Sequence, residues 1–243
     1  MTNLPLTRRR LQGFTLIEIA IVMLIITLLL TGLVPTISSQ IEQRQTNDTR
    51  KQLDEIQQAL LGYAVINGRL PCPASSSTNG QEDPPVVTGT CTHPNDGFIP
   101  AATLGLTNID SSGFAVDAWG NRIRYSVTTA VANAFTTAGG MSLAGNSALG
   151  NANLYICNTS TSITPSSCAA GTSLTANGAA VVIFSTGKDG SSGSVNPDEA
   201  ANLHGSTFKT FVSHDFTPTF DDLVIWISPN VLINRMVAAG KLP

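Results

Sequence analysis

An apolar run from Ile19 to Val34 is the feature that most constrains this chain. The longer segment from Phe14 to Val34 contains a single charged residue, Glu18. Its length is close to the ~20 residues that an α-helix needs to cross a bilayer. Three consecutive arginines, Arg8 to Arg10, precede it, and basic residues hold their end of a membrane helix in the cytoplasm. The sequence therefore predicts one membrane-spanning helix over residues 14–35, with the rest of the chain on the opposite side.

A secretory signal peptide is a poor alternative for this segment. Its apolar core would run for about 7–15 residues and end at a cleavage site of small residues. The run here is longer and ends in Leu33-Val34-Pro35-Thr36, which contains no such site.

The presence of Glu18 in this apolar segment requires an explanation, because hydrocarbon cannot solvate a carboxylate. An ionised acid at mid-bilayer costs roughly 2.5–3.5 kcal/mol, and less near a helix end, where Glu18 lies. An acid inside a membrane normally pairs with a cation. A cut after Gly13 would create an α-amino group on Phe14 one helical turn from Glu18, and the amine of a neighbouring copy could serve equally well.

These residues resemble the N-terminal signature of type IV pilins and of the pseudopilins of type II secretion. Those proteins carry a short basic leader, a cut after glycine, an N-methylated phenylalanine, a glutamate five residues into the mature chain and an apolar helix. The matching positions are a leader from Met1 to Gly13, cleavage between Gly13 and Phe14, methylation of Phe14, Glu18, and a helix from Phe14 onward. The resemblance covers the first quarter of the chain.

The resemblance implies a structural subunit and not an enzyme. It implies a pilin or pseudopilin, expected as a minor subunit, that sits in the bacterial inner membrane with a cytoplasmic N-terminus and a periplasmic domain over residues 36–243. The subunit would later enter a periplasmic or extracellular filament, where Glu18 pairs with the Phe14 amine of a neighbour. The implied partners are a prepilin peptidase, an assembly ATPase with its inner-membrane platform, and other pilin subunits.

Two other functions stay open. One is an envelope binding module that uses the helix only as a tether, and the other is a filament-tip subunit for adhesion or DNA uptake. Removal of the leader's three arginines leaves 10 of the 13 basic side chains against 16 acidic ones, a net charge of −6. That balance disfavours general nucleic-acid binding, which depends on basic surface.

The cysteines predict disulfides. An even set of four lies in the part of the chain assigned to an oxidising compartment. Three connectivities are possible, and pairing of nearest neighbours would join Cys72 to Cys91 and Cys157 to Cys168. Zinc is the alternative, but the sequence has no Cys-x-x-Cys and its histidines show no ligand spacing.

The predicted fold is α+β, with a long stalk helix that covers one face of a small antiparallel sheet, as in pilins. Leu53, Ile56, Leu60 and Tyr63 recur at helical spacing, so the helix is expected to continue to about Asn67. Its middle, residues 40–52, is polar and is expected to be exposed. The expected strands are 122–127, 154–157, 179–185 and 223–227, followed by a terminal helix over 231–239 that Ser228 begins and Gly240 ends; residues 135–153 are expected to form a loop.

A turn is predicted before the first of these strands. Asp117-Ala118-Trp119-Gly120-Asn121 resembles a turn of the major pseudopilins, in which Asp117 would cap the turn with its side chain and Trp119 would anchor the core.

Calcium is the one cofactor that the sequence suggests. Residues 187–222 are rich in the hard oxygen ligands that Ca²⁺ takes, and they are similar to the C-terminal loop in which major pseudopilins bind calcium. The alternative is that these acids support a turn or are solvated charges. Catalysis has no such support, because Gly187-Lys188-Asp189-Gly190 lacks the other residues of a phosphate loop. The candidate calcium ligands are Asp189, Asp198, Asp221 and Asp222.

Overall fold

The computed structural model describes residues 13–85, 89–190 and 196–242. The chain forms two compact units, Met1–Arg44 and Gln45–Pro243, and each is described by itself. The predicted leader lies outside the described residues except for Gly13.

The first unit contains the N-terminal part of helix α1, which runs from Leu16 to Asn67. Its large apolar side chains from Leu16 to Leu29 are exposed. Within the described residues, no helix combines the length and the apolar character that crossing a membrane requires. Part of the membrane segment predicted from the sequence, residues 30–37, has side chains that lie outside the description.

In the second unit, α1 buries the apolar stripe that the sequence predicts. Leu53, Ile56 and Leu60 are almost completely buried, and Ala64 extends the stripe where Tyr63 is only half-buried. The helix ends at Gly68, whose φ of 68° lies in the left-handed region and whose N–H donates to the Ala64 carbonyl at 2.8 Å. The predicted end of the helix is confirmed.

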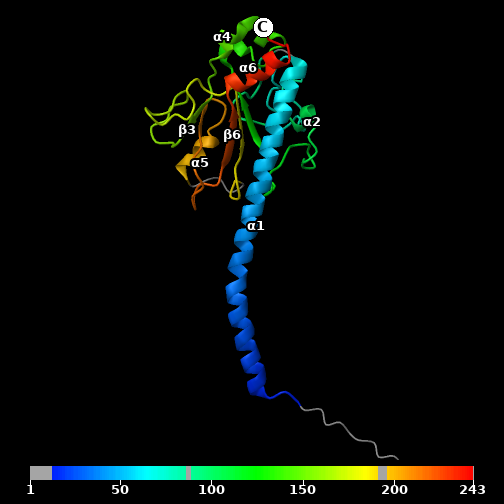
Figure 1. Cartoon of the computed structure of the whole chain (residues 1–243), viewed down its shortest axis with the longest axis vertical. Coiled ribbons are helices and arrows are strands. Elements are labelled where there is room, and N and C mark those ends of the chain that lie inside the picture. Colours follow the sequence, from blue (N-terminus) through cyan, green and yellow to red (C-terminus); the bar gives the residue numbers. More distant parts are fainter. Residues whose placement is uncertain (1–12, 86–88, 191–195, 243) are drawn as a thin grey trace, which may run out of the picture. The chain divides into compact units, whose positions relative to one another are not determined.

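A four-stranded antiparallel sheet packs against this part of α1 (Figure 1). Its strands are hydrogen-bonded in the order β1-β2-β4-β6. Tyr125 lies opposite Ile183, and Ile183 lies opposite Ile225. The predicted α+β class is confirmed by these elements: β1 (Gly97–Phe98), β2 (Arg124–Val127), β4 (Val181–Ser185) and β6 (Leu223–Ile227).

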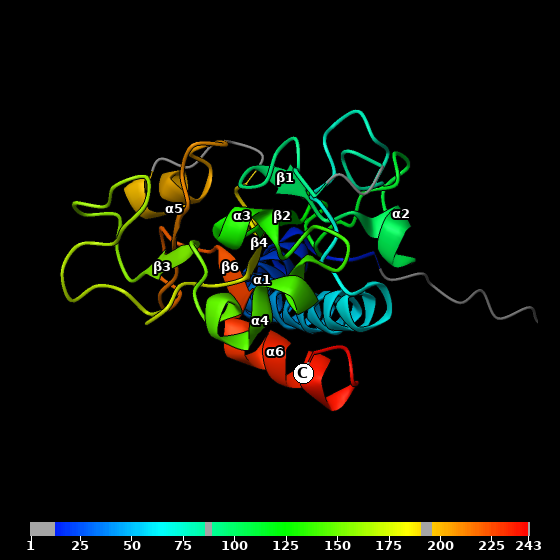
Figure 2. The same ribbon diagram turned by 90° about the horizontal axis from the view of Figure 1, so that it is seen from above.

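Strand β4 is buried on both faces because each face of the sheet is covered. Val181 and Ile183 belong to the core that includes α1, whereas Val182 and Phe184 pack with Phe211 in a second core. The second core is closed by a two-stranded sheet of β3 (Tyr155–Cys157) and β5 (Thr210–Val212). Figure 2 shows β3 and the cyan turns of α1 on opposite sides of the four-stranded sheet.

The prediction that β3 joins the main sheet is wrong. Strand β3 pairs in parallel with β5, whose residues the sequence analysis did not assign to a strand. Both edges of β4 are taken, by β2 and β6. The apolar side chains Leu154 and Ile156 are therefore buried against the face of the sheet and not at its edge.

The prediction of a loop over residues 135–153 is also wrong, because α4 occupies Gly140–Leu149. Met141 and Leu149 are buried in the core, and this tertiary packing offsets the low helix propensity of a glycine-rich segment. Gly145, with a φ of 75°, interrupts the regular helix. The other helices are α2 (Ala101–Leu104), α3 (Ala130–Asn133), α5 (Pro197–Asn202) and α6 (Pro229–Ala238).

The terminal helix α6 follows the sequence prediction closely. The Ser228 side chain accepts a hydrogen bond from the Val231 N–H, and Gly240 has a φ of 67°. These are a serine N-cap and a left-handed glycine at the C-terminal end.

The polar middle of α1 is not simply exposed, in contrast to the prediction. Thr49 is completely buried and accepts a hydrogen bond from the Ala118 N–H at 3.2 Å, while Gln45 donates to the Ala118 carbonyl and Gln52 to the Val116 carbonyl. These three side chains lie on one helical face and bind the backbone of the turn at residues 116–118.

Asp117 caps that turn, as predicted. Its Oδ1 accepts hydrogen bonds from the backbone N–H groups of Trp119 and Asn121, and its Oδ2 accepts one from the Ser185 hydroxyl. Trp119 packs against the core, although it is only half-buried.

Candidate functional site

The described residues that precede α1 are exposed. Gly13, Phe14 and Thr15 are not helical, and the Phe14 side chain is 82% exposed. Helix α1 begins at Leu16, so the Gly13–Phe14 peptide bond lies outside the helix. A peptidase could therefore reach this bond without unwinding α1.

Thr15 and Glu18 cap the N-terminus of α1 reciprocally. The Thr15 backbone N–H and hydroxyl both donate to Oε2 of Glu18, at 3.0 and 2.9 Å, and the Glu18 N–H donates to the Thr15 hydroxyl oxygen at 3.3 Å. This is a capping box, in which a threonine and a glutamate three residues later satisfy each other's backbone donors. The sequence analysis identified Glu18 but missed Thr15, although the Thr-x-x-Glu spacing was visible.

A second candidate site is an acidic cluster beside β6. Asp189, Glu199 and Asp221 place carboxylate oxygens within 4.8 Å of one another. Glu199 is 2% exposed and accepts a hydrogen bond from the Asp221 N–H, and Oδ1 of Asp221 is buried without a hydrogen-bond partner among the described residues. Carboxylate oxygens in this arrangement suit a hard divalent cation.

The cluster differs from the predicted set of ligands. Asp189 and Asp221 are in it, Glu199 replaces Asp198, and Asp222 lies next to it. Asp198 instead accepts a hydrogen bond from the Ser160 N–H, and its Oδ2 lies 3.3 Å from Nε2 of His214. Residues 198 and 199 follow each other in α5, so their side chains point in different directions, which spacing alone does not resolve.

Two adjacent acids of this region, Asp221 and Asp222, have raised pKa values. Burial raises the pKa of Asp222 to about 8, with further contributions from the negative charges of Glu199, Asp221 and Asp189. Burial also raises the pKa of Asp221 to about 6. A bound cation would relieve both effects, because it favours the charged form of each carboxyl group.

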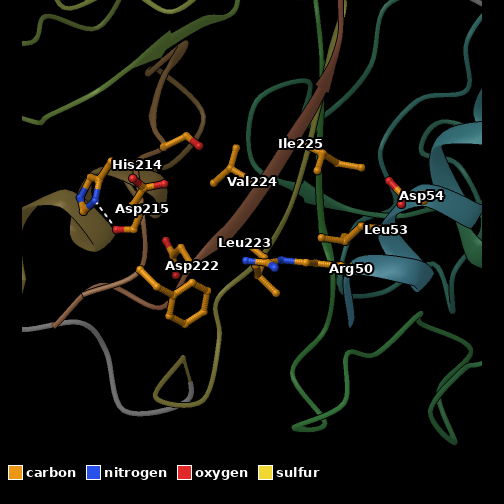
Figure 3. Close-up of a pocket in the computed structure, with 11 residues that line it drawn as sticks. Arg50, Leu53, Asp54, His214, Asp215, Asp222, Leu223, Val224 and Ile225 are labelled. Carbon is orange, nitrogen blue, oxygen red and sulfur yellow. Dashed lines mark hydrogen bonds between the residues drawn. The ribbon is translucent and has the colours of Figure 1, made fainter. Parts of the chain in front are cut away.

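A pocket of about 300 Å³ lies between α1 and β6 (Figure 3). Arg50 and Asp54 of α1 line one side, and His214, Asp215 and Asp222 line the other. The His214 ring is held in place by a hydrogen bond between its Nδ1 and the Asp215 carbonyl, at 2.8 Å, and by stacking on Phe220. The guanidinium of Arg50 and the carboxyl groups of Asp54, Asp215 and Asp222 therefore line the same pocket.

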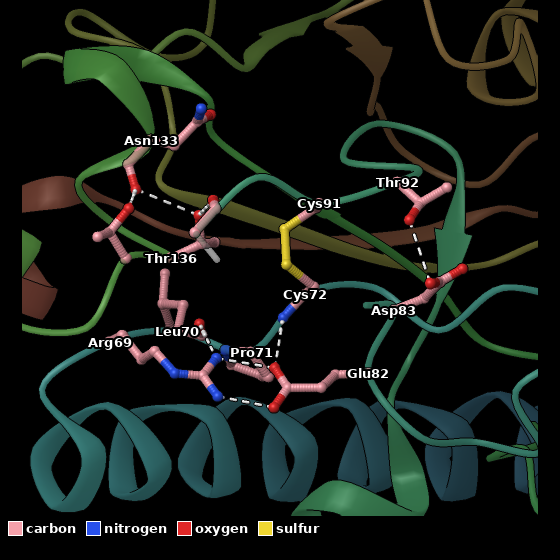
Figure 4. The surroundings of a disulfide bond; sticks show 12 residues. Arg69, Leu70, Pro71, Cys72, Glu82, Asp83, Cys91, Thr92, Asn133 and Thr136 are labelled. Carbon is pink, nitrogen blue, oxygen red and sulfur yellow. Dashed lines mark hydrogen bonds and ion pairs between the residues drawn. A yellow bond between two sulfur atoms is a disulfide. The ribbon is translucent and has the colours of Figure 1, made fainter. Parts of the chain in front are cut away.

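The four cysteines form two disulfides, Cys72–Cys91 and Cys157–Cys168. These are the pairs that nearest-neighbour pairing predicts. Figure 4 shows that the first disulfide lies beside an ion pair between Arg69 and Glu82. The Cys72 N–H also donates to Oε2 of Glu82, so this carboxylate holds the start of the disulfide loop.

Comparison with known protein families gives a match in the N-terminal segment of the chain. Residues 8–34 match the family model of the prokaryotic N-terminal methylation motif. This motif is the signature of type IV pilins and pseudopilins, and its matched segment contains Gly13, Phe14, Thr15 and Glu18. No curated protein and no solved structure matches the chain.

Proposed function

We propose that this chain is cleaved and N-methylated by a prepilin peptidase and then serves as a minor structural subunit of a type IV pilus or a type II secretion pseudopilus. The observation that carries the proposal is the methylation motif over residues 8–34. It is supported by the exposed, non-helical Gly13–Phe14 bond and by the α+β domain.

In this function the helix over residues 14–35 anchors the precursor in the inner membrane with the arginine-rich end in the cytoplasm. The domain that follows Pro35 faces the periplasm, and two disulfides agree with an oxidising compartment. An assembly ATPase and its membrane platform would move the processed subunit into the filament beside other pilin subunits. Glu18 would there pair with the Phe14 amine of a neighbour.

Intact-mass analysis of membrane-derived protein tests the processing step. The mature chain is expected to begin at Phe14 and to carry one added methyl group. Gly13→Ala should leave the precursor uncut, and Gly62→Ala, at an exposed position inside α1, is the matched control. A mature N-terminus at any other residue would contradict the proposal.

Assembly is tested by Glu18→Ala. Alanine is better tolerated in lipid than glutamate, so insertion and cleavage should persist, while the neighbour's amine loses its counter-charge in an apolar core. Processed protein should accumulate in the inner membrane with little in sheared filaments. If the variant enters filaments normally, Glu18 has no role in assembly; if the native chain never enters a filament, a tethered binding module becomes the better function.

Calcium binding at Asp189, Glu199 and Asp221 is a second proposal, supported by their mutual distance and by the unpartnered Oδ1 of Asp221. Millimolar calcium should raise the thermal midpoint of the full-length protein, and Glu199→Gln should abolish the rise. Asp198→Asn is the control, because Asp198 binds Ser160 and not the cluster. A calcium shift that survives Glu199→Gln would locate the ion elsewhere.

A further inference from the structure

We infer that the free edge of strand β6 is a docking site for an extended segment of another protein chain, one that carries lysine or arginine between apolar residues. The segment adds a strand to the sheet beside Val224 and brings its basic side chains to the carboxylates of Asp54 and Asp215. This inference goes beyond the proposed function, and its test needs no filament.

Strand β6 is the last strand of the sheet, and one of its edges is open. The Trp226 carbonyl faces away from β4, because it accepts a hydrogen bond at 3.1 Å from Nε2 of Gln57 on α1. Alternate residues of a strand point their backbone groups to the same edge, so Val224 also faces away from β4, while Ile225 faces β4 opposite Ile183. The N–H and carbonyl of Val224 have no hydrogen-bond partner among the described residues.

The outer edges of two other strands are covered, in contrast to β6. On the outer side of β1, Phe98 exchanges two backbone hydrogen bonds of 2.9 Å with Ala74. On β3, the Ile156 carbonyl accepts a hydrogen bond from the Leu174 N–H at 2.8 Å. Unpaired backbone groups on an edge strand are a template for pairing with another chain, and extended peptides bind to such edges by adding a strand.

The space beside Val224 is a slot between two layers. Leu223 and Ile225 pack in the core that includes α1, whereas Val224 packs in the second core, with β5. The pocket of about 300 Å³ opens along this edge, with residues 50–54 of α1 on one side and residues 213–216, which follow β5, on the other (Figure 3). A strand placed here would direct successive side chains alternately toward the two walls.

The charged groups of the two walls select the occupant. Arg50, Asp54 and Asp215 are exposed and form no ion pair with any described residue. Asp222, the other acid that lines the pocket, is buried and already hydrogen-bonded. Two free carboxylates against one guanidinium favour a segment of net positive charge, and charges beside an edge exclude strands that cannot complement them. The exposed ring of Phe216 offers an apolar contact.

A synthetic peptide tests the site on the full-length protein in detergent. The probe is Val-Lys-Val-Lys-Val, blocked at both ends, and the control peptide has glutamate in place of lysine. Hydrogen exchange measured by NMR follows two amides. The lysine peptide should slow the exchange of the Val224 amide, whereas the Ile225 amide, which faces β4, should be protected with or without peptide. The glutamate peptide should bind about tenfold more weakly, because its charges oppose the two carboxylates.

Val224→Pro removes the N–H at the free edge. Proline is tolerated in an edge strand where the N–H faces away from the neighbouring strand, so the variant should fold. It should bind the lysine peptide about tenfold more weakly, since the added strand loses a backbone donor. Val224→Ala shortens the side chain but keeps the N–H, and it should bind close to the native level.

A second pair of variants tests the charges. Asp54→Asn should weaken binding of the lysine peptide. Glu55→Gln is the matched control, because Glu55 is also exposed on α1 but does not line this pocket. An equal loss in both variants would indicate general attraction to an acidic protein and would overturn the inference.

Three other outcomes would also overturn it. They are equal binding of the two peptides, full binding by a folded Val224→Pro variant, and protection of the Val224 amide that grows with protein concentration without peptide, which would assign the edge to a second copy of this chain. If Val224→Pro does not fold, the native protein decides, since a Val224 amide that still exchanges freely with the lysine peptide present contradicts strand addition. Processing at Phe14 plays no part in these measurements, so the inference and the proposed function can fail separately.

Discussion

The Arg69 guanidinium and the Glu82 carboxylate form two hydrogen bonds, of 2.7 and 2.8 Å, in the protein interior. The side chains are only 8% and 10% exposed. The bond to Glu82 is the main cause that raises the pKa of Arg69 above its usual value, against the opposing effect of burial. The pair ties the end of α1 to the Cys72–Cys91 loop, as Figure 4 shows.

Breaking this pair from one side should destabilise the domain strongly. Glu82→Ala is expected to lower the free energy of unfolding by about 3–5 kcal/mol, because it leaves the Arg69 charge buried and uncompensated. Urea denaturation of the full-length protein in detergent measures the loss. Asp83→Ala is the neighbouring control, since Asp83 accepts an exposed hydrogen bond from Thr92.

The double variant Arg69→Met with Glu82→Leu should be less destabilised than Glu82→Ala. Both charges are then absent, and apolar side chains fill a similar volume. A double variant that is less stable than the single one would mean that the pair contributes through specific hydrogen bonds, such as the one to the Cys72 N–H, and not through charge compensation.

Both disulfides should be found by peptide mapping without reduction, with Cys72 linked to Cys91 and Cys157 to Cys168. Free thiols would contradict the assigned compartment, and crossed pairs would contradict the structure.

Removal of each disulfide by paired Cys→Ala changes should have unequal effects. The cysteines are 19 and 11 residues apart in sequence, and because the entropy of loop closure depends only on the logarithm of loop length, chain entropy predicts about 3 kcal/mol for each. Loss of Cys72–Cys91 should cost more, because that loop also carries Glu82, whereas most of the segment between Cys157 and Cys168 is exposed. Chemical denaturation of the two paired variants compares them directly, and an equal loss would show that entropy alone accounts for both.

Stability should fall as the pH rises from about 4 to 8 in the absence of calcium. The pKa of Asp222 is about 8 in the folded protein and about 3.8 in its unperturbed state, so the folded chain holds a proton that the unfolded chain releases. The contribution is complete below pH 4 and is lost as the pH approaches 8. The expected loss is roughly 2 kcal/mol, less than the full linkage value because the neighbouring acids titrate together.

Asp222→Asn should flatten this pH dependence, because asparagine keeps an oxygen that can accept the Asn202 hydrogen bond and carries no charge. Thermal midpoints measured from pH 5 to pH 8 in chelator provide the comparison. Asp215→Asn is the control, since Asp215 is exposed. An unchanged pH profile in Asp222→Asn would assign the titration to another group.

Local patterns were enough to predict much of this protein. The methylation motif, the buried stripe from Leu53 to Leu60, the Gly68 end of α1 and strand β6 all depend on residues close together in the chain, where periodicity and capping act directly. The nearest-neighbour disulfides belong to the same class, because each closes a short loop.

The tertiary structure decided what depends on distant partners. Strand β3 does not pair with the main sheet, because both edges of β4 are paired with β2 and β6. Helix α4 forms in a glycine-rich segment because Met141 and Leu149 pack in the hydrophobic core. Glu199 rather than Asp198 joined the acidic cluster, since the orientation of α5 selects one of two adjacent acids. Composition and spacing carry no information about these choices, because each is set by the free energy of packing against residues far away in sequence.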